Sequence, residues 1–198
     1  MKNKILLIIV IIAAVVRFFG LGQFPNGFNG DEAGQGYMAY SILTTGRDEW
    51  GKILPIFPRG FGDFKSPVYS YLTIPSVAIL GLTVEAVRFP AAILGILTVL
   101  VVYFLSKELF NDKIGLWSSF LIAISPWHIQ ISRTAFEANA GILFFSLGLL
   151  FFLKWLKNGQ NLPLVSLFWG LTLYTYDAYK FFMGIFIFST ILLYRKKL

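Results

Sequence analysis

The 198-residue sequence contains no cysteine, a single histidine and few charged side chains. Without cysteine the chain can form neither a disulfide framework nor a thiolate site, and His128 alone cannot build a zinc centre. Charged residues make up 14% of the chain and hydrophobic residues 57%. These values are typical of a protein with several membrane spans rather than of a soluble domain. The sequence therefore predicts an all-α integral membrane protein.

The net charge of +7 could indicate a nucleic-acid partner, but the basic residues are scattered in ones and twos between apolar runs. A nucleic-acid surface gathers its basic residues into one patch, whereas scattered flanking lysines and arginines orient spans in a bilayer. We therefore expect membrane lipids, and no nucleic acid, among the partners.

The first apolar run, Ile5–Val16, follows a basic N-terminus that contains Lys2 and Lys4. No small-x-small cleavage site comes after the run, so we interpret it as an uncleaved first span; a cleaved signal peptide is the alternative. The remaining apolar runs are Pro67–Leu82, Val84–Leu105, Ile114–Ile131, Ala138–Phe152, Leu162–Tyr176 and Phe181–Tyr194.

The distribution of charge indicates that one of these runs does not cross the membrane. If Pro67–Leu82 is not a transmembrane span, nine basic and two acidic residues lie on the same side of the membrane as the N-terminus. Eight basic and eight acidic residues then lie on the other side. This asymmetry agrees with the positive-inside rule. The run would reach about 24 Å as a helix, less than the roughly 30 Å hydrocarbon core. A helix in the outer interface fits these observations, and an ordinary short span is the alternative.

Two further features of this run favour the interface. Pro75 interrupts its middle. A weakly polar stripe follows one helical face at a spacing of three or four residues, formed by Ser66, Ser70, Thr73 and Ser76.

The resulting organisation is a single membrane-embedded domain, 1–198, with about six transmembrane helices and an external segment over residues 21–83. That segment would hold two juxtamembrane helices, Pro67–Leu82 and Asp31–Thr45, the latter capped by Asn29 or Asp31. The last run has only 14 residues and ends close to Leu198, so we expect the chain to be truncated. The N-terminus would be cytoplasmic and the external segment would face outside the plasma membrane.

Asp31 and Glu32 are the leading candidates for chemistry. Adjacent carboxylates next to a membrane span are costly unless they bind a ligand or react. Gly30, Gly34 and Gly36 surround them and permit the close approach of a ligand. The alternative is a plain helix start, where acids favour the positive end of the helix dipole.

Two more groups of polar residues lie in the predicted external regions. Lys65 precedes the interfacial helix, where it could contact a lipid phosphate or simply snorkel to the interface; Arg59 and Tyr37 are further candidate substrate-binding residues. The second group comprises Arg133, Glu137 and Asn139. These three could bind an anionic sugar-lipid head, or they could be helix caps and a local ion pair. His128 is interpreted as an interface residue.

The order of several short motifs resembles a known family. The motifs are Asp-Glu-Ala at 31–33, Lys-Ser-Pro at 65–67, Ala-Val-Arg at 86–88, Leu-Phe-Asn-Asp-Lys at 109–113 and Ser-Arg at 132–133. Together they resemble the N-terminal part of the protein O-mannosyltransferase-like glycosyltransferases. These are membrane-embedded enzymes that use polyprenyl-phosphate donors, and they include the lipid A aminoarabinose transferases.

The resemblance implies roles for individual residues. Asp31 would be the catalytic base with Glu32 as its partner, and Lys65 would contact the donor phosphate. Glu137 is the nearest match to a second acidic position, with Asn139 as the alternative after a one-residue slip. The aminoarabinose transferases carry an arginine shortly after their Asp-Glu, where this chain has Gln35 and Tyr37.

Some relatives of this class bind a divalent metal at the first-loop acid. Asp31 is therefore a possible metal ligand, although the sequence does not require a metal and no other cofactor is expected.

The function implied by the resemblance is transfer of a sugar from a polyprenyl-phosphate donor to a hydroxyl of a lipid, glycan or protein acceptor outside the membrane, with inversion. Lys65, with Arg133, would hold the leaving phosphate. The alternatives are a non-catalytic transporter or lipid-binding module, and an inactive truncated fragment of a transferase. Transporters place ionisable residues at mid-membrane, whereas the predicted spans here are nearly free of charge.

Overall fold

The computed structural model describes residues 2–59 and 65–195, and within them the regular structure is helical. The elements are α1 (Lys2–Phe18), α2 (Gly30–Thr45), α3 (Pro67–Leu80), α4 (Val84–Leu109), α5 (Asp112–Ile124), α6 (Pro126–Ile131), α7 (Ala138–Asn158), α8 (Leu162–Leu173) and α9 (Asp177–Tyr194). The predicted all-α class is confirmed. Residues 60–64, next to the candidate Lys65, and the basic Lys196 and Lys197 lie outside the described residues.

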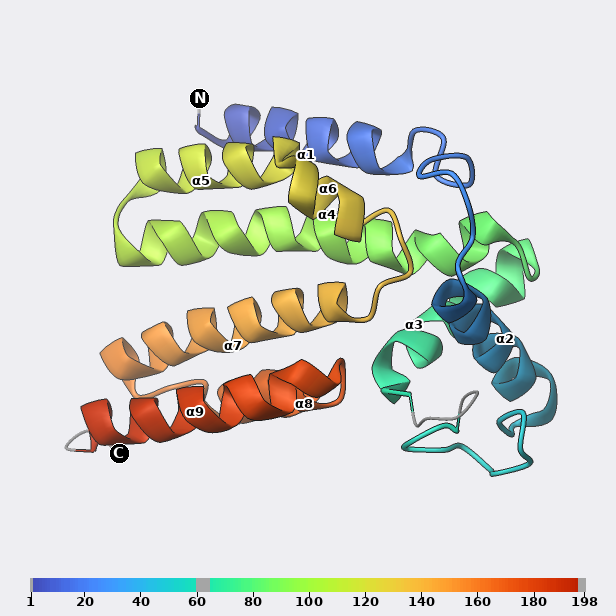
Figure 1. Ribbon diagram of the computed structural model, residues 1–198. Coiled ribbons are helices and arrows are strands. Elements are labelled where there is room, and N and C mark those ends of the chain that lie inside the picture. Colours follow the sequence, from blue (N-terminus) through green and yellow to red (C-terminus); the bar gives the residue numbers. More distant parts are fainter. Residues whose placement is uncertain (1, 60–64, 196–198) are drawn as a thin grey trace.

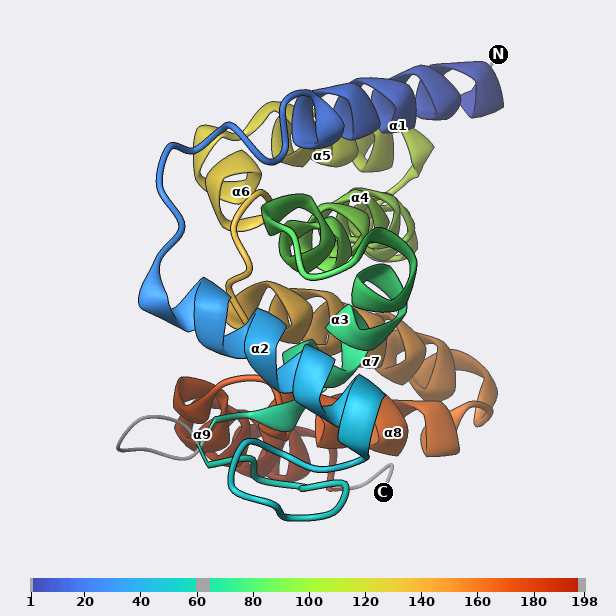
Figure 2. The same cartoon turned by 90° about the vertical axis from the view of Figure 1, so that its right-hand side faces the viewer.

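The long helices form a bundle with α2 and α3 across one of its ends. In Figure 1, α1, α5, α4, α7 and α9 run side by side, and both chain termini lie at the left-hand end. Figure 2 looks at the opposite end, where α2 and α3 lie in front of the bundle. The two predicted juxtamembrane helices are therefore present, and they share one end of the molecule.

Helices α4, α7 and α9 are each long and apolar enough to cross a membrane. Helices α3 and α8 are shorter apolar helices, and α1 has 17 residues. Large apolar side chains are exposed along the bundle, for example Ile8, Leu121 and Ile185 at 56%, 60% and 71%. A soluble protein would bury such side chains, so the surface is that of a membrane protein.

At the end that carries the N-terminus, ion pairs connect the helices. Lys2 and Lys107 both contact the Asp112 carboxylate, at 2.8 and 2.9 Å, and Lys157 contacts Glu108 at 2.6 Å. These pairs bring together the start of α1, the end of α4, the start of α5 and the end of α7. The predicted grouping of these basic residues at one end is confirmed.

The predicted single span Ile114–Ile131 is wrong, because the helix breaks into α5 and α6. Pro126 has no backbone N–H to donate to the Ile122 carbonyl, and Ser125 before it is extended, with ψ of 119°. The freed carbonyls of Ile122 and Ala123 accept hydrogen bonds from the buried Arg17 guanidinium instead, at 3.4 and 3.1 Å.

The other boundaries differ from prediction by a turn or less, except at α7. Helix α7 continues through Lys154 and Lys157 to a left-handed Gly159, with φ of 67°, six residues beyond the predicted end. Helix α9 begins at Asp177 rather than Phe181, with the acid in its first turn. In both cases the helix includes charged residues beyond the apolar run, so the run alone predicted a helix that is too short.

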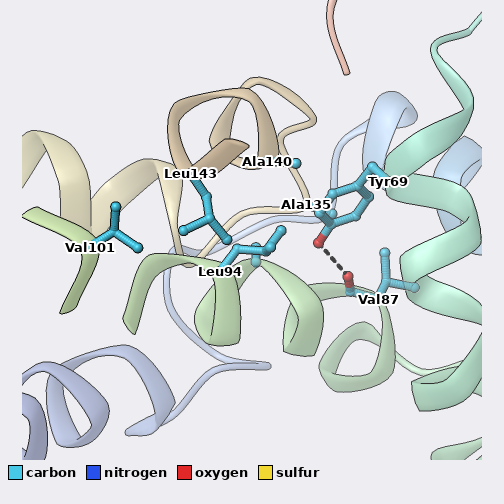
Figure 3. Close-up of a cluster of buried hydrophobic side chains, with 8 residues drawn as sticks. Tyr69, Val87, Leu94, Val101, Ala135, Ala140 and Leu143 are labelled. Carbon is cyan, nitrogen blue, oxygen red and sulfur yellow. Dashed lines mark hydrogen bonds between the residues drawn. The ribbon is translucent and has the colours of Figure 1, made fainter. Parts of the chain in front are cut away.

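Helix α3 turns its polar stripe inward. Ser70, Thr73 and Ser76 are buried, and Ser76 donates to the Ala86 carbonyl on α4 at 2.6 Å. Tyr69 enters a core cluster with Leu94 and Leu143 and donates to the Val87 carbonyl at 2.8 Å (Figure 3). The stripe therefore fixes α3 to the bundle rather than facing water, while Ile79 on the outer face is 81% exposed.

Labelling of single cysteines tests this arrangement, because the chain has no cysteine of its own. Asp31→Cys and Lys113→Cys place thiols at exposed positions on α2 and α5, at opposite ends of the bundle. An impermeant thiol reagent should label only the first in intact cells and both after permeabilisation. Equal labelling of the two in intact cells would contradict a bundle that crosses the membrane.

Candidate active site

The N-terminus of α2 is held by a capping box. The Asn29 side chain accepts from the Glu32 backbone N–H at 2.8 Å, and the Glu32 carboxylate accepts from the Asn29 N–H at 3.2 Å. Of the two caps that the sequence allowed, Asn29 is the one observed. Asp31 and Glu32 both lie in the first turn, where the helix dipole favours negative charge.

Glu32 points into the protein and is only 2% exposed. One carboxylate oxygen accepts from Arg88 Nε at 2.8 Å and from the Ala135 N–H at 3.1 Å, and the other accepts from Arg88 Nη2 at 3.0 Å. Burial alone would raise the pKa of Glu32, but these hydrogen bonds outweigh it and hold the pKa below its ordinary value. Glu32 is therefore ionised and forms a buried ion pair with Arg88.

Arg88, at the start of α4, is fully buried. Besides Glu32, its guanidinium donates to the carbonyls of Leu21, Pro25 and Gly27, at 3.2, 3.0 and 2.5 Å. A guanidinium has five N–H donors, and the five hydrogen bonds to Arg88 match that number. The α1–α2 connection and the first turn of α2 are thus fixed to α4.

Asp31 points away from this network, with 66% of its side chain exposed. Its carboxylate contacts Lys65 Nζ at 2.7 Å, across 34 residues of sequence. Two residues selected independently from the sequence therefore meet at one place, between the start of α2 and the start of α3. An exposed pair of this kind contributes only about 0–1 kcal/mol, so a phosphate can compete for the lysine.

Glu137 lies at the same place, at the N-terminus of α7. Burial raises the pKa of Glu137 to about 7, and nearby Lys65 and Gln35 oppose that rise. Gln35 is buried and accepts a hydrogen bond from Ser70 on α3. The structure therefore brings Asp31, Lys65 and Glu137 together, from three separate parts of the chain.

Asn139, the alternative to Glu137, is fully buried between helices. Its side-chain nitrogen donates to the Ala91 carbonyl on α4 at 2.9 Å. This contact joins α7 to α4, whereas Glu137 lies close enough to Lys65 and Asp31 for their charges to act on it.

Arg133 does not face the Asp31–Lys65 pair. It is 8% exposed, and its guanidinium donates to the carbonyls of Val16, Arg17, Phe19, Gly20 and Phe24, at and beyond the end of α1. Arg133 therefore acts as a helix cap, the alternative stated for it in the sequence analysis. The last carbonyls of a helix have no partner within the helix, and Arg133 donates hydrogen bonds to them.

The interpretation of His128 as an interface residue is wrong. It is fully buried beside Arg17, whose Nη2 lies 2.7 Å from its Nδ1. After the break at Pro126, α6 packs against α4 and His128 is carried inward, while the neighbouring Trp127 remains 62% exposed.

Tyr37 and Arg59 lie beside an open groove on the outer face of α2. The groove has a volume of about 570 Å³ and is lined by Gly30, Ala33, Gly34, Tyr37, Glu49 and Trp50. The Arg59 guanidinium sits 4.5 Å from the centre of the Trp50 ring. Aromatic faces next to a carboxylate are suited to a hydroxyl-rich ligand.

A second groove begins directly after Lys65. Pro67, Val68, Tyr71 and Leu72 on α3 line it together with Phe144 on α7 and Leu171 on α8, and its volume is about 460 Å³. The lining is almost wholly apolar, so the groove offers a hydrocarbon chain a path from the lysine toward the bundle.

A metal ion on Asp31 would need further ligands from side chains, water or substrate. Within the described ranges, 2–59 and 65–195, no group of three or more His, Cys, Asp or Glu side chains is placed to hold a metal ion. Among these residues Asp31 is therefore a lone carboxylate ligand, and a metal ion on it would take its remaining ligands from water or from a donor phosphate.

The sequence reasoning missed the roles of Arg17 and Arg88. In the sequence Arg17 stands out only as a charge on the outer side of the membrane, and Arg88 only as such a charge and as the last residue of the Ala-Val-Arg motif. The sequence feature that could have indicated these roles is an arginine close to a connection rich in glycine and proline. The backbone carbonyls of such a connection need hydrogen-bond donors, and an arginine can supply them.

Comparison with known proteins places the chain among membrane glycosyltransferases. Residues 64–196, 133 of the 198, match the family model of the dolichyl-phosphate-mannose-protein mannosyltransferases. Comparison of the sequence with curated proteins gives no match.

The solved structures of an archaeal oligosaccharyltransferase, AglB from Archaeoglobus fulgidus, share the fold. The form with an inhibitory peptide and a dolichol-phosphate has a TM-score of 0.69 at 20% identity, covering 98% of this chain and 25% of that chain. The apo form gives 0.69 at 20%, with 98% and 26% covered. The chain spans about a quarter of their length.

The family match covers two thirds of the chain and includes Lys65, α3 and Glu137, which form the candidate site with Asp31. The chain belongs to the dolichyl-phosphate-mannose-protein mannosyltransferase family.

Proposed function

We propose that this protein transfers a sugar from a polyprenyl-phosphate donor to an acceptor hydroxyl, with Asp31 as the general base. The observation that carries the proposal is the 2.7 Å contact between Asp31 and Lys65 in front of a fixed helix N-terminus. A base and a phosphate-binding cation at one exposed place are the two parts that this chemistry needs.

The reaction would run in one displacement. The acceptor hydroxyl gives its proton to Asp31 while its oxygen forms a bond to the anomeric carbon. The bond between that carbon and the phosphate oxygen breaks on the opposite face, so the configuration inverts. The polyprenyl phosphate leaves with the bond electrons and gains one negative charge. Lys65 faces that growing charge, so its attraction is stronger in the transition state than in the bound donor.

Donor binding would also release the base. The phosphate takes Lys65 from Asp31 at little cost, because the exposed pair is weak. The freed carboxylate then accepts the proton. The apolar groove that begins at Pro67 would hold the first isoprenoid units of the donor.

The buried residues have supporting roles in this proposal. Glu32 positions the first turn of α2 through Arg88 and takes no proton, because its charge is fully hydrogen-bonded. Arg133 holds the end of α1 and is not assigned to the leaving phosphate. Glu137, whose pKa burial raises to about 7, would accept a hydrogen bond from the donor or acceptor sugar. No step is assigned to a metal.

The site would face the outside of the plasma membrane. Lys2, Lys4, Lys107 and Lys113 lie at the other end of the bundle, and the positive-inside rule keeps such a group in the cytoplasm. The acceptor, a hydroxyl of a lipid, glycan or protein, would bind in the groove along α2.

Asp31→Asn tests the base. The substitution keeps the size of the side chain and most of its preference for a helix N-terminus, so the protein should insert normally. Loss of a general base should lower the transfer rate on the order of 100- to 10,000-fold with near-normal donor binding. The measurement uses membranes with a panel of labelled polyprenyl-phosphate sugars.

Two variants are matched to it. Glu108→Gln changes an acid that pairs with Lys157 at the opposite end of the bundle, and should leave the rate unchanged. Glu32→Gln should lower transfer less than Asp31→Asn and should also lower thermal stability. Wild-type transfer by Asp31→Asn would favour the alternative of a non-catalytic lipid-binding or transport protein.

Lys65→Ala tests the phosphate contact. A charge-assisted hydrogen bond of this kind is worth about 1.5–3 kcal/mol, so the donor KM should rise on the order of tenfold to a hundredfold. Lys52→Ala, which removes an exposed lysine from the same external segment, should leave the donor KM unchanged. A donor KM that stays at the wild-type value in Lys65→Ala would reduce Lys65 to an interfacial anchor.

Gly34→Leu tests the acceptor groove. A side chain at Gly34 meets no atom within 4 Å, and leucine favours a helix over glycine by roughly 0.8–1 kcal/mol, so folding should not suffer. The new side chain occupies the groove and should raise the acceptor KM on the order of tenfold while leaving the donor KM unchanged. Gly184→Leu on α9, where space is equally open, is the control. An unchanged acceptor KM in Gly34→Leu would place the acceptor elsewhere.

A further inference from the structure

A groove between α1 and α5 lies far from the candidate active site. It has a volume of about 410 Å³ and is lined by side chains of both helices, including Ile5, Ile8 and Ile12 on α1 and Leu116 and Phe120 on α5. The two helices lie side by side in both views of the bundle (Figures 1 and 2). Its lining exposes no polar surface, so water is a poor occupant and a hydrocarbon chain is a good one.

The groove has a single charged residue in its lining, Lys113, in the first turn of α5. Of the neighbouring lysines, Lys2 and Lys107 share the Asp112 carboxylate, which offsets one of their two charges, and Lys4 is outside the groove lining. Within the part of the chain that the structure describes, Lys113 is exposed and takes part in no ion pair. Trp117, one turn further along and 59% exposed, also lines the groove, as is common for an aromatic ring at the membrane surface.

We propose that this groove is a binding site for an anionic phospholipid, with one acyl chain between α1 and α5 and the phosphate on Lys113. From Lys113 to Phe120 the helix rises by about 10 Å, roughly a third of the hydrocarbon core, so the groove holds the upper part of a chain. A lysine at this depth should favour an anionic over a zwitterionic headgroup by roughly fivefold.

The site is independent of the proposed glycosyl transfer. None of its residues contacts Asp31, Lys65 or the groove along α2, and the helix end that carries Lys113 is opposite the end covered by α2 and α3. The lipid would come from the leaflet opposite the candidate active site, which is the cytoplasmic leaflet if the positive-inside rule holds. Its binding can therefore be measured whether or not the chain transfers a sugar.

The headgroup contact is tested by native mass spectrometry of the purified protein in detergent, with phosphatidylglycerol and phosphatidylcholine of identical acyl chains. Phosphatidylglycerol should bind about fivefold more tightly to the wild-type protein. Lys113→Gln should abolish that preference. Lys154→Gln removes a lysine from α7 that lies outside the groove lining and should preserve it. Equal affinity of the wild-type protein for the two lipids, or a preference that survives in Lys113→Gln, would overturn the proposal.

The acyl-chain contact is tested by two adjacent substitutions on α1. Ile8 and Leu7 are 56% and 59% exposed, but only Ile8 lines the groove. Ile8→Trp should fill the groove and weaken phosphatidylglycerol binding on the order of fivefold or more, whereas Leu7→Trp should leave it unchanged. The same lipid affinity in both variants would show that the chain lies outside the groove and would reject the site as proposed.

Discussion

The structure depends on satisfying three arginines buried where the bundle meets its external segment. Arg17, Arg88 and Arg133 are each less than 9% exposed. Moving a guanidinium out of water costs several kcal/mol, and here most donors are matched by backbone carbonyls and, for Arg88, by Glu32. Arg17 also contacts the His128 ring, and its Nε has no partner among the described residues. The carbonyls come from places where helices break or end, so each arginine closes a gap in backbone hydrogen bonding. Removing one partner of the Glu32–Arg88 pair should cost about 3–5 kcal/mol for that reason.

This constraint explains why two adjacent carboxylates have opposite environments. Successive helical residues point about 100° apart, so α2 cannot turn both Asp31 and Glu32 toward the same neighbour. Glu32 faces α4 and completes the capping box, the Arg88 pair and the Ala135 contact. Asp31 is consequently directed outward to Lys65. Asp31, which makes none of these structural contacts, is the acid to which we assign proton transfer in the proposed function.

Much of this could be predicted from the sequence, because hydropathy and charge are local properties. The apolar runs predicted the bundle helices and a short α3, the charge distribution predicted the basic residues at one end, and the cap at Asn29 predicted α2. The break at Pro126 has a local signal that the apolar run concealed, because a proline ends or kinks a helix. The inward face of α3 could not be predicted, since it depends on a partner distant in the chain, Ala86 for Ser76. For the same reason, no pattern within 132–139 distinguished Arg133 as a cap from Glu137 as a neighbour of Lys65.

The two acid–base pairs of the candidate site differ in strength, and that difference has a functional consequence. The Glu32–Arg88 pair is buried and carries several hydrogen bonds, so it holds the start of α2 at a fixed position relative to α4. The Asp31–Lys65 pair is open to solvent on the Asp31 side, where 66% of the side chain is exposed against 25% for Lys65, so it is exchanged at lower cost. In the proposed reaction, a donor phosphate would therefore displace Asp31 from Lys65 without disturbing the helix that carries Asp31. If both pairs were buried, the phosphate would have to break a strong contact; if both were exposed, the base would have no fixed position.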